Sequence, residues 1–108
     1  MALVEFQGRR ETREPVEMMA RFRHHITTVT VMLKDITQHG AKIEGMAGLM
    51  RDDAAFLMLP CLAPKLVFVA WSNGHGAGLE FDEPLDNTVF SQLVRDFGRR
   101  FETLPKVA

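Results

Sequence analysis

The sequence predicts a mainly β fold, a small barrel or sandwich of about six short strands, followed by a C-terminal helix. Two observations predict it. Between residues 16 and 81, short apolar or β-branched segments alternate with links that contain Gly, Pro and Asn, which is typical of strands and turns. After residue 84 the apolar residues take the spacing of an amphipathic helix. The predicted strands cover residues 16–23, 28–36, 41–44, 55–59, 66–71 and 77–81.

The composition indicates one soluble globular domain. The chain has 108 residues, of which 46% are hydrophobic and 25% are charged, and these values argue against a disordered tail or a coiled coil. It has neither the ~20 apolar residues of a membrane helix nor a signal-peptide pattern, so we expect no membrane insertion. Cys61 is the single cysteine, which excludes an intrachain disulfide framework and favours a reducing, cytoplasmic location. The chain has 13 basic and 14 acidic residues, so it lacks the excess of positive charge that is typical of nucleic-acid-binding proteins, and we expect no DNA or RNA binding.

The chain is predicted to begin with a flexible, exposed arm over residues 1–14, followed by a single domain over residues 15–104. A charge cluster near the end of the arm contains Arg9, Arg10 and Arg13. Pro15 disfavours the α region for the residue before it, so the chain should enter its first strand in an extended conformation.

The strongest strand pattern is that of residues 28–36. Val31 and Leu33 share one parity, and the same parity places Asp35 on the core side, at the end of the strand and so at the rim of a barrel. His24 and His25 are expected in the turn before this strand. Adjacent residues of a strand point to opposite faces, and histidines in a turn are usually solvated, so we expect no metal site there.

Two of the later strands lack the alternation of polar and apolar residues. Residues 55–59 and 66–71 are continuous apolar runs, which predicts strands covered on both faces. Residues 73–76 form a hairpin-turn signal, and the strand after it should direct Leu79 and Phe81 inward. Trp71 is expected at the end of a strand, in the core or at the rim, with contact to a ligand as the alternative.

A helix is predicted from about residue 86 to residue 102. Asp86 is a good N-cap, and Leu85 and Phe90 flank it at the spacing of a hydrophobic staple. One apolar stripe should pack the helix on the strands; it consists of Val89, Phe90, Leu93, Val94, Phe97 and Phe101.

The sequence contains no constellation that predicts catalysis. It lacks a Gly-rich phosphate loop and a Cys/His cluster with zinc spacing, and Ser72 and Ser91 have no nearby histidine and acid. The seven methionines are more typical of core packing than of a cofactor site. We therefore expect a protein that is not an enzyme and that uses no cofactor or metal.

Two features remain as candidates for a binding site. One is the arginine cluster, with Arg9 and Arg13 four residues apart; the other is the hexapeptide Asp-Ile-Thr-Gln-His-Gly at residues 35–40. Each has a simpler interpretation. The arginines would form a solvated arm, and the hexapeptide a turn in which Asp35 and Thr37 bond local backbone and Gly40 supplies a positive φ. Together, arginine forks beside a rim carboxylate suit a guanine nucleotide, since arginine matches guanine O6 and N7 and also clamps phosphate.

These two motifs, in this order, resemble those of the PilZ domain family. The family has RxxxR on an N-terminal arm, matched by Arg9 to Arg13, and then (D/N)xSxxG, matched by residues 35–40 except that Thr37 replaces serine. Residues 69–71 and 78–81 also resemble the last two strands of the family. The resemblance implies a six-stranded antiparallel β-barrel with a C-terminal α-helix packed on it, and it implies cyclic di-GMP as the ligand.

The resemblance also implies roles for the motif residues. Arg9 and Arg13 would grip guanine and phosphate with Arg10 as a companion, and Asp35 would read a guanine edge. The hydroxyl of Thr37 would replace that of serine, and Gly40 would let the backbone approach the ligand. We expect a cyclic di-GMP receptor in second-messenger signalling, in which the ligand orders the arm and a protein effector responds.

Three alternatives remain open. One is an adaptor of the same family that binds protein but no ligand. Another is a small nucleic-acid-binding barrel, which would need exposed stacking aromatics, whereas the phenylalanines fall at core or helix-stripe positions. The last is an enzyme.

Overall fold

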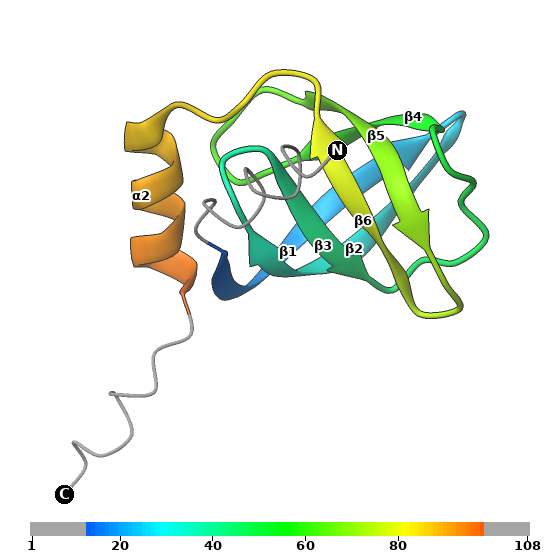
Figure 1. Ribbon diagram of the computed structural model, residues 1–108, viewed down its shortest axis with the longest axis horizontal. Coiled ribbons are helices and arrows are strands. Elements are labelled where there is room, and N and C mark those ends of the chain that lie inside the picture. Colours follow the sequence, from blue (N-terminus) through cyan, green and yellow to red (C-terminus); the bar gives the residue numbers. More distant parts are fainter. Residues whose placement is uncertain (1–12, 99–108) are drawn as a thin grey trace, which may run out of the picture.

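The computed structural model describes residues 13–98, which form a closed antiparallel barrel followed by one helix (Figure 1). The strands lie in the order β1-β2-β3-β6-β5-β4. The fold is therefore mainly β, as predicted. No helix of the described part is long and apolar enough to cross a bilayer. The elements are β1 (Glu14–His24), β2 (Thr27–Ile36), β3 (Gly40–Glu44), β4 (Ala54–Met58), β5 (Lys65–Ser72), β6 (Gly76–Phe81) and α2 (Asn87–Phe97).

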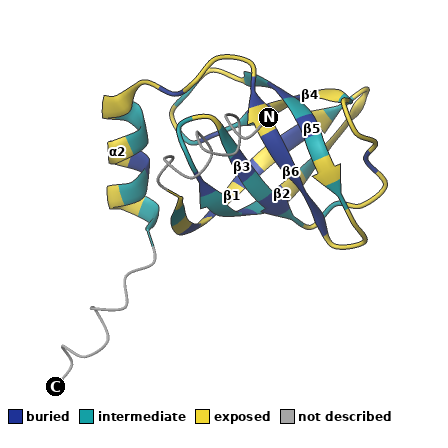
Figure 2. Ribbon diagram, in the orientation of Figure 1, coloured by how far each residue is buried: buried dark blue, intermediate teal, exposed yellow. Residues whose placement is uncertain are grey.

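Alternation along the strands builds the core. On β1, every second residue from Val16 to Phe22 is buried, while the residues between them are exposed, and Figure 2 shows the same alternation around the barrel. Leu79 and Phe81 face inward as predicted. No charged or polar side chain of the described residues is buried, so the interior is apolar throughout. The largest fully buried side chains are Phe22, Met18, Leu33, Ile36, Ile43, Leu57, Val16, Val67 and Val69.

The prediction that β4 and β5 are covered on both faces is wrong. Ala55 and Leu57 of β4 are buried, but Phe56 between them is 39% exposed on the outer face. The reason is that α2 packs against β1 and leaves the outer face of β4 without a covering helix. Phe56 is therefore an exposed aromatic residue, contrary to the expectation that the phenylalanines lie in the core or on the helix stripe.

Two strand irregularities reverse the direction of particular side chains. On β2, the pairing with β3 skips Lys34 between Leu33 and Asp35, which is a β-bulge. The extra residue turns Ile36 into the core, where it is fully buried, and turns Asp35 to the outer face. The parity prediction that placed Asp35 on the core side is therefore wrong, because strict alternation ends at the bulge.

The second bulge lies on β5. Pairing with β6 skips Ala70 between Val69 and Trp71. Val69 is buried, whereas Trp71 is 44% exposed on the outer face rather than in the core. One inserted residue on each strand thus brings a candidate site residue to the outside of the barrel.

Helix α2 begins as predicted and ends earlier than predicted. The Asp86 side chain accepts a hydrogen bond from the Thr88 N–H at 3.0 Å, which confirms the N-cap. The helix ends at Phe97, not near residue 102, because Gly98 is extended and forms a β-bridge to Val16. This bridge fixes the end of α2 beside the start of β1 (Figure 1). Leu93 is buried, and the other described stripe residues pack against the core; Phe101 lies outside the described residues.

Candidate functional site

The structure brings Arg13 and Asp35 together. Pro15 of β1 pairs with Asp35 of β2, so Arg13, which directly precedes β1, lies beside the end of β2. A guanidinium nitrogen of Arg13 donates to Asp35 Oδ2 at 3.3 Å. The side chains are 65% and 28% exposed respectively, and such exposed ion pairs contribute about 0–1 kcal/mol to stability. Breaking this ion pair therefore costs little free energy, and each side chain can then bind another partner.

Arg9 and Arg10 lie outside the described residues. Their contribution to a site stays a prediction from the sequence. Arg13 is the one member of the arginine cluster whose position the structure describes.

The turn between β2 and β3 is closed by Thr37. Its hydroxyl oxygen accepts from the backbone N–H groups of His39 and Gly40, each at 3.0 Å, and its own N–H donates to the Gly40 carbonyl at 2.9 Å. The interpretation of Thr37 as a residue that bonds local backbone is confirmed. Asp35 differs from that interpretation, because its side chain pairs with Arg13 instead.

Gly40 has a structural role that differs from the expected one. The positive-φ glycines of the described chain are Gly45 and Gly48, so the prediction of a positive φ at Gly40 is wrong. A Cβ on Gly40 would instead overlap the carbonyl oxygen of Leu79 on the neighbouring strand β6. Glycine is therefore required here because β3 and β6 approach each other closely.

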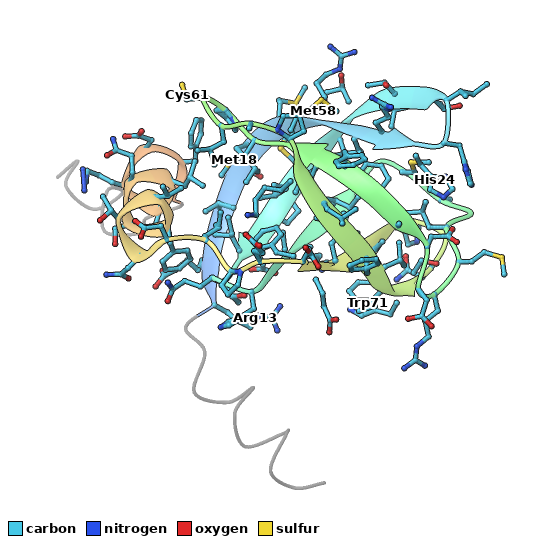
Figure 3. All side chains as sticks on the ribbon, turned by 90° about the horizontal axis from the view of Figure 1, so that it is seen from above. Arg13, Met18, His24, Met58, Cys61 and Trp71 are labelled. Carbon is cyan, nitrogen blue, oxygen red and sulfur yellow. The ribbon has the colours of Figure 1, made fainter. Side chains whose placement is uncertain are left out.

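Strand register places four residues in one row on the outer face, which we call the outer row: Asp35, Lys42, Gly78 and Trp71. Asp35 pairs with Lys42 across β2 and β3, Lys42 pairs with Gly78 across β3 and β6, and Gly78 pairs with Trp71 across β6 and β5. Strands in a sheet lie about 4.8 Å apart, so the row extends about 14 Å from Asp35 to Trp71. Arg13 and Trp71 lie on the same side of the barrel in Figure 3, opposite Met58 and Cys61.

The indole of Trp71 rests on Gly78. A Cβ at Gly78 would overlap the indole ring, and no side chain of residue 78 separates the ring from the sheet. The absence of a side chain at residue 78 therefore lets the ring lie against the barrel wall while 44% of the residue stays exposed. An exposed aromatic ring fixed in this way can stack with a planar ligand.

Sequence reasoning missed Lys42. The residue follows Gly40 by two positions and lies between two buried neighbours, Ala41 and Ile43, so alternation alone turns it outward. Only the cross-strand register shows that it lies between Asp35 and Gly78. Arg13 and the outer row together supply two cations, an acceptor at Asp35 and an aromatic surface at Trp71, which is a set of groups that can contact a phosphorylated purine.

A different arrangement lies at the far end of β1. His24 Nε2 lies 3.0 Å from Asp53 Oδ2, and the same oxygen accepts from the Met50 N–H at 3.0 Å. The backbone bond from Met50, with a smaller contribution from His24, holds the pKa of Asp53 below its ordinary value of 3.8. The expectation that both histidines are solvated is wrong for His24, whose side chain is 15% exposed, because the β1–β2 hairpin folds against the loop before β4.

Searches of protein-family models and of curated proteins found no match to this chain. The assignment of function therefore depends on the residues of the outer row and of the turn beside it.

Proposed function

We propose that the chain is a PilZ-type receptor for cyclic di-GMP, and that the ligand binds over the start of β1 and the outer row. The observation that carries the proposal is the contact between Arg13 and Asp35, which belong to the two halves of the motif pair and lie 22 residues apart in the chain. The closed six-stranded barrel with a C-terminal helix is the fold that the motif resemblance implies.

Ligand binding would replace the ion pair with contacts to the nucleotide. Asp35 has two carboxylate oxygens, which accept from the N1–H and N2–H groups of one guanine. Arg13, released from Asp35, donates its fork to guanine O6 and N7 or to phosphate, and Arg9 contributes the second guanidinium. In this proposal the ligand holds residues 9–13 against the barrel and so changes the surface that an effector meets.

The rest of the outer row extends the site. Lys42 lies next to Asp35 across the strand pair and supplies an ammonium for the second phosphate. Trp71 offers a ring for stacking with the second guanine, at the other end of the row. Thr37 and Gly40 act indirectly, since they fix the turn and the strand spacing on which Asp35 and Lys42 depend.

Calorimetric titration of cyclic di-GMP into the full chain tests the proposal. We expect Asp35→Ala and Arg13→Ala each to weaken binding tenfold or more, since each removes charge-assisted contacts of about 1–3 kcal/mol. The melting temperature should change little, because the pair that is lost is exposed.

Arg21→Ala is the matched control, because Arg21 is an exposed arginine farther along β1 that pairs with Thr30. Its affinity should equal that of the wild type. Unchanged affinity in folded Asp35→Ala and Arg13→Ala proteins would place the ligand elsewhere.

A ligand-blind adaptor is the second candidate. The observation that favours it is that Asp35 and the Thr37 hydroxyl both have partners within the chain itself. The same titration separates the two functions, because the adaptor gives no binding heat with the wild-type chain.

A further inference from the structure

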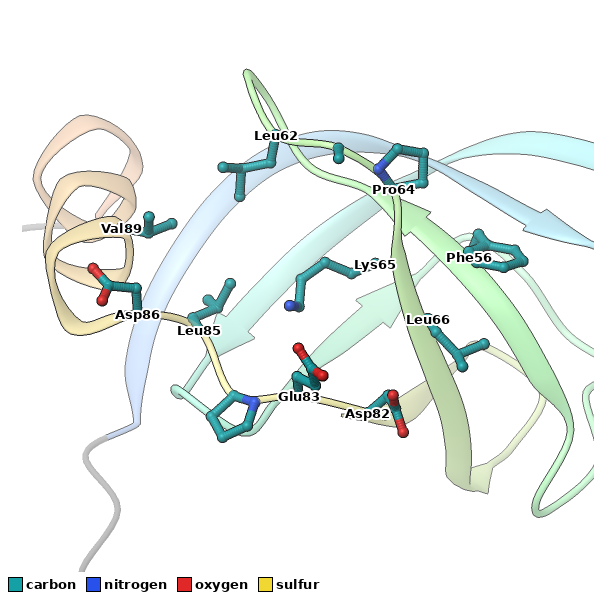
Figure 4. A pocket seen from close by; sticks show the side chains of 12 residues that line it. Phe56, Leu62, Pro64, Lys65, Leu66, Asp82, Glu83, Leu85, Asp86 and Val89 are labelled. Atoms are coloured by element: carbon teal, nitrogen blue, oxygen red, sulfur yellow. The ribbon is translucent and has the colours of Figure 1, made fainter.

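A groove lies between the β4–β5 connection and the link from β6 to α2 (Figure 4). Its volume is about 480 Å³, within the range of sites that accept a few side chains or a small ligand. Leu62 and Pro64 form one wall, and Pro84 and Val89 contribute to the other. Prolines on both sides limit backbone freedom, so the groove needs little ordering before it is occupied.

The charged residues of the groove are mainly acidic. Asp82, Glu83 and Asp86 line it, against one lysine, Lys65. The Lys65 ammonium lies 5.6 Å from the centroid of the Phe81 ring, and within residues 13–98 no ion pair joins it to these acids. The groove therefore combines apolar walls with an excess of negative charge.

We propose that this groove docks a basic and apolar segment of a partner protein, the effector of the receptor. The apolar walls favour aliphatic side chains, and Asp82 and Glu83 favour lysine or arginine beside them. An acidic or neutral segment would leave these carboxylates without a partner.

The groove is also joined to the turn beside the outer row. The Leu85 N–H donates to the Gln38 carbonyl at 2.7 Å, and the Gln38 side-chain amide donates to the Leu85 carbonyl at 3.1 Å. Leu85 lines the groove, while Gln38 follows Thr37 in the turn. Docking itself depends on the groove alone, whereas control of docking by cyclic di-GMP through this link rests on the proposed function.

The test is an amide NMR titration of the full chain with two capped peptides, GLKVRLG and GLEVELG. The first supplies two cations between aliphatic residues, and the second replaces both cations by acids. We expect the basic peptide alone to shift amides of residues 62–66 and 82–89. The double variant Asp82→Asn/Glu83→Gln should weaken its binding tenfold or more, whereas Asp96→Asn, an acid near the other end of α2, should leave binding unchanged.

Several results would overturn the proposal. These are equal shifts with both peptides, shifts outside the groove, or no effect of the double variant. Groove shifts that grow with protein concentration without peptide would assign the groove to a second copy of the chain. Groove shifts caused by Arg99→Glu/Arg100→Glu without peptide would assign it to the chain's own C-terminal segment.

Calorimetry with cyclic di-GMP on the same samples separates this proposal from the proposed function. The double variant should bind cyclic di-GMP as the wild type does. If cyclic di-GMP binds but the peptide does not, only the groove proposal is wrong. If the peptide binds but cyclic di-GMP does not, only the receptor function is wrong.

Discussion

Thr37 shows how a single side chain can fix the geometry of a turn. Its hydroxyl accepts from two backbone N–H groups and so fixes the turn that follows Asp35. Serine has the same hydroxyl, so serine at residue 37 can close the turn in the same way.

Substitution of Thr37 separates the hydroxyl from the methyl group. Thr37→Ser should keep stability within about 0.5 kcal/mol of the wild type and bind cyclic di-GMP at least as well. Thr37→Val keeps the shape but leaves two N–H groups without their acceptor, so we expect unfolding to become about 1–2 kcal/mol easier and binding to weaken. Chemical denaturation and calorimetry measure the two effects. Equal stability and equal affinity in all three proteins would show that the Thr37 hydroxyl contributes to neither.

Asp53 predicts a pH dependence at the other end of β1. Its pKa is lower in the folded chain than the ordinary 3.8, so the folded state favours the ionised form. The resulting stabilisation is present above pH 3.8 and disappears as the pH falls through the lower, folded-state pKa.

Denaturation of wild type and Asp53→Asn between pH 7 and pH 2.5 measures this contribution. The difference in unfolding free energy between the two proteins should be constant above about pH 5 and shrink toward the acid end. A difference that is independent of pH would show that the carboxylate charge contributes nothing at this position.

The elements differ in how far the sequence predicts them. The start of α2 depends on local signals, an N-cap aspartate and a helical stripe, and it is placed correctly from them. Its end was predicted too late because Phe101 continues the stripe, although Gly98, which bridges to Val16, is a local stop signal.

The alternation of side chains along a strand could not predict that Asp35 and Trp71 point to the outer face of the barrel. Each follows a bulge, and a bulge depends on the register with the partner strand rather than on the segment itself. The motif resemblance assigned Arg13 and Asp35 to one site, but it did not predict their direct contact, and the position of Lys42 required the cross-strand register. The motif residues were therefore accessible from sequence, and the surface that joins them was not.

Two glycines on adjacent strands should respond differently to alanine. At Gly40 the new Cβ meets the backbone of Leu79, which moves only if β3 and β6 separate, so Gly40→Ala should cost more than about 2 kcal/mol of stability. At Gly78 it meets the half-exposed indole of Trp71, which can turn outward, so the loss should be about 1 kcal/mol.

Trp71 is the one tryptophan of the chain, so its fluorescence reports the change at Gly78 directly. Emission should move to longer wavelength in Gly78→Ala and stay in place in any folded Gly40→Ala protein. Similar stability losses at both glycines would contradict the strand spacing described for β3 and β6.

At the scale of the whole molecule, the barrel closes so that its first and second strands bring an arginine and an aspartate from two distant motifs together. The outer row then continues from β2 across β3 and β6 to β5, along neighbouring strands of the closed barrel. Leu85, which lines the groove, is joined by hydrogen bonds to Gln38 in the turn that follows Asp35. The two proposals therefore place the nucleotide on the outer row and the partner in a groove that this turn joins to the row.

Amide hydrogen exchange with and without cyclic di-GMP tests the central claim most directly. Saturating ligand should increase the protection of residues 8–14 and of the turn at residues 35–40, because the proposed function places both segments against the nucleotide. The amides around His24 and Asp53, at the other end of β1, should not change. Residues 8–14 that are equally protected in both states, or that stay unprotected at saturating ligand, would contradict binding on this face.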